Sequence, residues 1–101
     1  MASKQVNLYV NDAQAEIDYF VQGFIDHVLS GILNALRGTC RIKKLDLSLE
    51  GDTVTVDLNG SIVPINDFVN KIIRNTVVGM VTSLKGVSEV KKLKIEISRH
   101  L

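Results

Sequence analysis

The sequence predicts an α+β fold built from two copies of a strand-helix-strand unit. The segment that begins at Gly38 returns 48 residues later at Gly86, with the glycine, the Lys-Lys-Leu and the apolar alternation in register. Residues 6–49 align with residues 54–97 without a gap, and 12 of the 44 pairs are identical, where unrelated sequences give roughly three. Two copies are too few for a solenoid. We therefore expect one domain over residues 1–101, with pseudo-repeats at about 4–50 and 52–98.

The first unit begins with a predicted strand over residues 6–10, where apolar and polar side chains alternate, as in a half-buried strand. Asn11 and Gln14 match a capping box, in which two side chains satisfy free N–H groups at a helix start. Gly38 is expected to end this helix in the left-handed conformation. Apolar residues recur through the helix at spacings of three and four, which predicts an amphipathic helix: Ile17, Phe20, Val21, Phe24, Ile25, Val28, Leu29, Ile32 and Leu36.

A second strand follows, in which Leu45, Leu47 and Leu49 alternate with polar residues. Gly51 lies in a tight turn, so the third strand, over residues 54–58, is expected to pair with it as a hairpin. Pro64 suits the first turn of a second helix, because its missing N–H would be unpaired there anyway.

The second helix is predicted to repeat this apolar stripe from Ile65 to Leu84, with Phe68 at the position of Phe20, and to end at Gly86. The last strand covers residues 93–97. Strand-helix-strand repeated twice usually gives a ferredoxin-like βαββαβ plait, with four antiparallel strands in the order 4-1-3-2 and two helices on one face. The alternative is a three-stranded sheet with residues 6–10 unpaired. The repeat argues against it, because residues 6–10 align with a strand.

The composition limits the class of protein. Nearly half of the 101 residues are apolar and the formal net charge is +1, so the chain is globular and has no overall field for nucleic acid or anionic lipid. A single cysteine makes no internal disulfide, and no run of 18 apolar residues predicts a membrane span. The start of the chain has no signal-peptide pattern. We expect a cytoplasmic protein that does not bind membranes.

No catalytic, cofactor or metal pattern is found in the sequence. His27 is separated from Cys40 by 13 residues, which is on the order of 20 Å along a helix and too far for a catalytic dyad. No Asp, Glu and His cluster has the spacing of metal ligands. We predict that the protein is not an enzyme and uses no cofactor. Gly31 and Gly79 occupy equivalent positions and are expected to let the two helices approach closely.

Each helix has a wider apolar arc than one face of a sheet requires, which indicates an interface. The side chains expected there are Tyr19, Leu33, Val78 and Val81, and a second copy of the chain is the simplest partner. Asp46 and Lys94 have opposite charges at equivalent positions on the two expected edge strands. Edge-to-edge pairing between chains is expected to bring them together.

Two other functions are left open. Nucleic acid would bind the rows of Lys43, Lys44, Lys91, Lys92 and Lys94, although Tyr9 is the one aromatic residue on the expected central strands. A small ligand would occupy a cleft between protomers, oriented by Tyr9 or His27. The preferred interpretation is a non-enzymatic interaction module that forms a homo-oligomer.

Overall fold

The chain folds as six strands and two helices in the computed structural model, which describes residues 3–37, 42–84, 86–87 and 89–100. The elements are β1 (Ser3–Val10), β2 (Ala13–Ala15), α1 (Tyr19–Arg37), β3 (Lys44–Glu50), β4 (Thr53–Leu58), β5 (Ser61–Ile62), α2 (Asp67–Thr82) and β6 (Lys92–His100). Each element of the first repeat has its counterpart 48 residues later, so that β1, β2, α1 and β3 correspond to β4, β5, α2 and β6.

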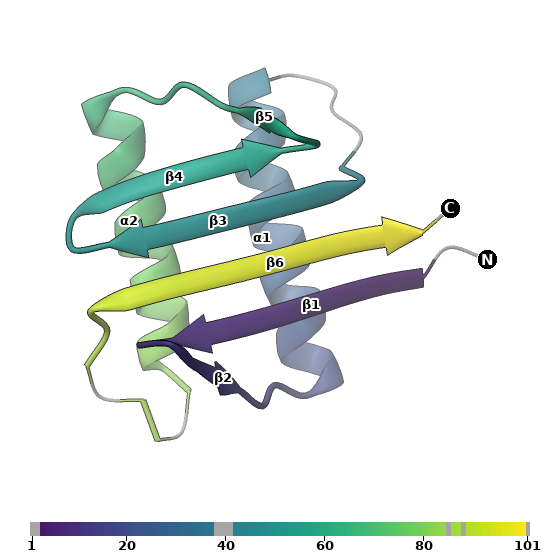
Figure 1. The fold of residues 1–101 in the computed structure, drawn as a ribbon, viewed down its shortest axis with the longest axis vertical. Helices are drawn as coiled ribbons and strands as arrows, with labels where there is room; N and C mark the ends of the chain where they lie inside the picture. Colours follow the sequence, from purple (N-terminus) through teal and green to yellow (C-terminus); the bar gives the residue numbers. More distant parts are fainter. Residues whose placement is uncertain (1–2, 38–41, 85, 88, 101) are drawn as a thin grey trace.

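All six strands form one open antiparallel sheet in the order β2-β1-β6-β3-β4-β5. The two helices lie side by side behind one face of the sheet, run in opposite directions and cross the strands steeply (Figure 1). The predicted α+β class and the antiparallel sheet are confirmed.

The predicted four-stranded plait with the order 4-1-3-2 is wrong. The strand that follows the helix of each repeat, β3 or β6, lies at the centre of the sheet. The strand that begins the repeat, β1 or β4, lies outside it. The three-stranded alternative is also wrong, because β1 pairs with β6 from Ser3 to Val10.

Two hairpins explain this arrangement. Asn11 and Asp12 have φ values of 51° and 69°, and Asn59 and Gly60 have values of 53° and 89°. Both pairs form two-residue turns of the type that matches strand twist, and they fold β2 back onto β1 and β5 back onto β4. One side of β1 is occupied by β2 and one side of β4 by β5. Neither β1 nor β4 can therefore pair with two long strands, as the central strands of the predicted plait would.

The turn asparagines also join the two repeats. The Oδ1 atom of Asn11 accepts hydrogen bonds from the backbone N–H groups of Lys91 and Lys92, at 2.7 and 3.0 Å. Asn59 accepts equivalent bonds from Lys43 and Lys44, at 2.8 and 2.9 Å. Each asparagine thus holds the start of a central strand that belongs to the other repeat.

The predicted capping box at Asn11 is therefore wrong. The first turns of the helices are capped by Asp18 and Asn66, whose Oδ1 atoms accept from the N–H groups of Val21 and Val69, both at 2.8 Å. Pro64 precedes Asn66 and so lies before the helix.

Two glycines were predicted to end the helices. Gly38 lies outside the described residues. Gly86 has a positive φ of 87°, but α2 already ends at Thr82.

The core lies between the sheet and the helices. The apolar side chains predicted to face inward from the strands are buried, apart from the half-buried Val10. Leu47 lies opposite Ile95 at the centre of the β3–β6 pair. These two residues occupy equivalent positions in the repeats. A pseudo-two-fold axis therefore passes through the centre of the sheet and between the helices.

The helices are rotated relative to the prediction. Leu33 and Val81, expected at the surface, are 3% and 0% exposed, whereas Phe20 and Phe68, assigned to the buried stripe, are 73% and 69% exposed. Phe24 is about half exposed, as is its counterpart in α2. The apolar arc is wider than the sheet can cover, and the sheet covers the side centred on Leu29 and Val77.

Candidate functional site

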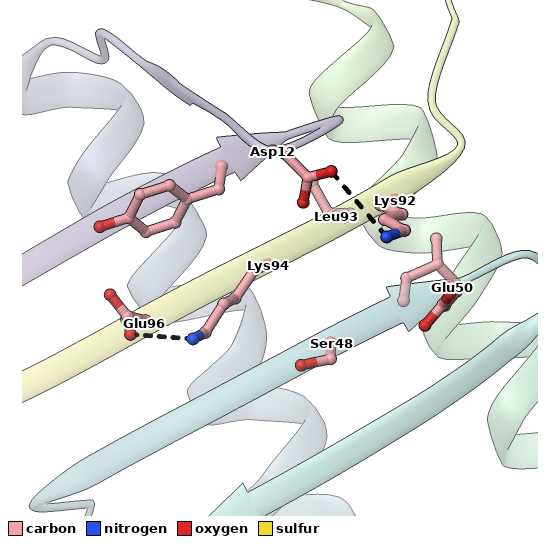
Figure 2. A pocket seen from close by; sticks show the side chains of 9 residues that line it. Asp12, Ser48, Glu50, Lys92, Leu93, Lys94 and Glu96 are labelled. Carbon is pink, nitrogen blue, oxygen red and sulfur yellow. Dashed lines mark ion pairs between the residues drawn. The ribbon is translucent and has the colours of Figure 1, made fainter.

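The open face of the sheet, opposite the helices, is polar. A shallow depression of about 340 Å³ lies over β1, β6 and β3 and is lined in part by Tyr9, Ser48 and Lys94 (Figure 2). Lys94 forms an ion pair with Glu96 at 3.3 Å, and the more distant Lys92–Asp12 pair spans 3.9 Å. The charges in this depression largely neutralise one another.

A row of carboxylates crosses the same face. Asp46 lies directly opposite Asp57 on β4 and Glu96 on β6, and like charges in such positions repel. Lys94 follows on the next row, opposite Ser48. The prediction that Asp46 and Lys94 lie on the two edges of the sheet is wrong, because β3 and β6 are its central pair.

The two residues proposed for a polar ligand site lie on different faces. Tyr9 lines the depression on the open face of the sheet, and His27 is exposed on α1, behind the other face. A single cleft does not contain both side chains. Cys40 lies outside the described residues.

Among the residues that the structure describes, no three His, Cys, Asp or Glu side chains gather in an arrangement that could hold a metal ion. No helix in the described part of the chain is long and apolar enough to cross a membrane.

A buried ion pair anchors α1 to the sheet. Asp26 is 3% exposed, and its Oδ1 atom lies 2.6 Å from Nη2 of Arg99, which also donates a hydrogen bond to Ser30 Oγ at 3.0 Å. At the equivalent place in the second repeat, Arg74 pairs with the exposed carboxylate of Asp52 at 3.0 Å. Both pairs join a helix to the sheet, and we assign them a structural role.

The surface of the helices that points away from the sheet is apolar at one end of each helix. We define the outer helix face as the residues on this side of α1 and α2: Phe20, Phe24, His27 and Gly31, with their counterparts Phe68, Ile72, Asn75 and Gly79. The rings of Phe20 and Phe24 lie 6.1 Å apart between centroids, tilted by 36°, within the usual range for aromatic pairs. The face thus carries two equivalent apolar clusters.

A groove of about 370 Å³ opens between the start of α1 and the end of α2. It is lined almost wholly by apolar side chains, together with one glycine and one serine: Phe20, Val21, Phe24, Ile25, Gly79, Met80, Val81, Ser83 and Leu84. A Cβ atom added at Gly31 or Gly79 would meet nothing within 4 Å. The prediction that these glycines bring the two helices together is therefore wrong, since both face open space.

The structure separates the four predicted interface residues of the helices. Tyr19 is 89% exposed at the start of α1, Val78 is half-buried on the flank of α2, and Leu33 and Val81 belong to the core. Sequence reasoning missed the apolar clusters of the outer helix face. The signal for them was the identity of Phe20 and Phe68, which we interpreted as shared core.

No protein-family model, curated protein or solved structure matches this chain.

Proposed function

We propose that the protein is a non-enzymatic interaction module that self-associates through the outer helix face. The observation that carries the proposal is the pair of exposed apolar clusters, Phe20 with Phe24 and Phe68 with Ile72, on one surface. Large exposed apolar side chains that lie together commonly mark an interface. Full burial of one phenylalanine side chain stabilises an assembly by about 1.5–3 kcal/mol.

The sheet edges offer less to a partner. Both outermost strands are very short, with three residues in β2 and two in β5, and short edge strands discourage edge-to-edge association. Ile62 on β5 is the one large apolar side chain that is strongly exposed among the described residues of the sheet. Substitution of Ile62 therefore tests whether chains associate through the sheet edge.

Nucleic-acid binding is the weaker alternative. Lys94 is paired with Glu96, and Asp46 and Asp57 share the open face of the sheet with it, so this face is not a basic surface. Tyr9 offers a single ring, whereas sheet modules that bind RNA stack two or three bases on aromatic side chains.

The experiment is a solution mass from light scattering on a sizing column, with absorbance recorded at 260 and 280 nm. We expect at least twice the 11.1 kDa of the chain. The double variant Phe20→Ser/Phe68→Ser is expected to be a folded monomer, because both side chains are mostly exposed and their loss creates no cavity.

The matched control is Ile62→Ser, which removes an equally exposed apolar side chain from the sheet edge. It is expected to keep the mass of the wild type. A monomeric wild type would refute the proposal. If Ile62→Ser dissociates the assembly and Phe20→Ser/Phe68→Ser does not, the interface lies at the sheet edge. An excess of absorbance at 260 nm that disappears at high salt would favour nucleic-acid binding.

A further inference from the structure

Each helix of the outer helix face has a bulky half and a small half. In α1 the outward positions run from Phe20 and Phe24 through His27 to Gly31 and Ala35. These positions are spaced by three or four residues, so they form one line along the helix. The first half of the line projects large side chains, and the second half leaves an open surface.

The second helix repeats this order 48 residues later, with Phe68 and Ile72 first, Asn75 in the middle, and Gly79 and the C-cap residue Ser83 last. Since the helices run in opposite directions (Figure 1), the bulky half of α1 lies beside the small half of α2. The groove lined by Phe24 and Gly79 is the place where these halves meet. Projections and hollows therefore alternate around the pseudo-two-fold axis.

We propose that a second copy of this chain docks face to face, so that the bulky half of each helix packs over the small half of an antiparallel helix in the partner. This inference rests on the proposed function and specifies its contacts. In this arrangement Phe24 and Ile72 lie over glycines of the facing helices, and Phe20 and Phe68 lie over Ala35 or Ser83. The two glycines act as specificity-determining positions, because any larger side chain there would collide with the incoming ring.

The symmetry of the face supports a second copy as the occupant. A two-fold dimer needs a surface that is complementary to itself. A dimer axis that lies in the plane of the face, either along the helices or across them, brings antiparallel helices together. With either axis, the bulky half of one helix lies over the small half of the facing helix, because α1 and α2 have the same order of large and small residues.

Charge and size are also compatible with a second copy. The eight residues of the outer helix face include no Lys, Arg, Asp or Glu, so two such faces do not repel each other. With 19 residues in α1, the face is about 28 Å long, and two adjacent helices are about 20 Å wide. Its footprint is therefore about 560 Å², close to the lower end of the roughly 600–1,000 Å² per partner that stable interfaces bury.

The test places a leucine at each hollow. Gly31→Leu and Gly79→Leu are expected to fold, because an added Cβ meets open space and leucine is a better helix former than glycine. We expect each variant to weaken the dimer at least tenfold in Kd, and the double variant to be monomeric with an unchanged far-UV circular dichroism spectrum. The melting temperature of that monomer should be no lower than that of the monomeric Phe20→Ser/Phe68→Ser variant.

Gly23→Leu is the matched control. Gly23 belongs to the same helix and also faces open space, but it lies on the flank of α1, and its counterpart in α2 is the long side chain of Lys71. This variant is expected to keep the mass and Kd of the wild type.

The possible results separate the two proposals. A dimer that is dissociated by Phe20→Ser/Phe68→Ser but not by the glycine variants would overturn this inference and leave the proposed function standing. Equal weakening by Gly23→Leu would also overturn it. A monomeric wild type would remove both proposals, and binding of an apolar dye by that monomer, lost in Gly79→Leu, would make the groove a ligand site instead.

Discussion

Asp26 is the one polar or charged residue among the described residues with less than a tenth of its surface exposed. Its position in the middle of α1 faces the end of β6, where Arg99 pairs with it. Burial of a carboxylate is costly unless it is paired and hydrogen-bonded, so this contact helps to fix the rotation of the helix. The rotation in turn decides which apolar side chains of α1 are left at the surface.

We predict that Arg99→Met destabilises the fold by about 3 kcal/mol, because it removes the guanidinium that is bonded at 2.6 Å to a buried carboxylate. The measurement is the urea midpoint of unfolding. Arg74→Met is the matched control, since the Arg74–Asp52 pair joins the equivalent helix to the sheet but is exposed. Its loss is expected to cost at most about 1 kcal/mol. Equal losses in the two variants would contradict a special role for the buried pair.

At the scale of the element, the two hairpin turns decide the order of the strands. Asn11 and Asn59 combine a left-handed backbone conformation with a side chain that accepts two N–H groups from the other repeat. Asparagine is among the few residues other than glycine that adopt this conformation readily. The turn and the contact between repeats therefore depend on one residue in each half.

We predict that Asn59→Gly destabilises the protein by about 1–2 kcal/mol. Glycine keeps the positive φ without strain, so the loss reports the contacts of the asparagine side chain, among them the hydrogen bonds from Lys43 and Lys44. Chemical denaturation followed by circular dichroism measures it. Asp12→Gly is a change in the other hairpin turn, at a position with a φ of 69°; it leaves these hydrogen bonds in place and removes an exposed ion pair of 3.9 Å with Lys92. Its stability is expected to stay within about 0.5 kcal/mol of the wild type, and an equally large loss there would refute this role of the asparagine.

At the scale of the whole molecule, the sheet has one face covered by helices and one open polar face, and the helices have an uncovered apolar surface. If a second copy covers that surface, association and folding are linked. The native state is then favoured at high protein concentration, because the partner binds the folded chain and not the unfolded one.

We therefore predict a melting temperature that rises by several degrees between about 1 and 100 μM protein. Differential scanning fluorimetry or circular dichroism at matched heating rates measures the change. The Phe20→Ser/Phe68→Ser variant should melt at the same temperature across this range. A wild type whose melting temperature is independent of concentration would contradict self-association in this range.

The sequence alone determined the repeat, the existence and type of both helices, the four longer strands, and the hairpin between β3 and β4. Periodicity and turn residues are local signals, and they are sufficient for these features. Each of the longer strands buries side chains that the alternation indicated, from Val6 in β1 to Ile97 in β6, whereas Val10 at the end of β1 is half-buried.

The strand order, the short strands β2 and β5, and the rotation of the helices were decided only by the tertiary structure. Strands of two or three residues are too short to show a period. The hydrogen bond between Asn11 and Lys91 joins residues that are 80 positions apart in the sequence, so no local pattern predicts it. The apolar arc of α1 includes both Phe20 and Leu33, and only contact with the sheet decides which of them is buried. The sequence predicted an apolar interface on the helices but not its residues, for the same reason: they are the apolar side chains that the sheet does not cover.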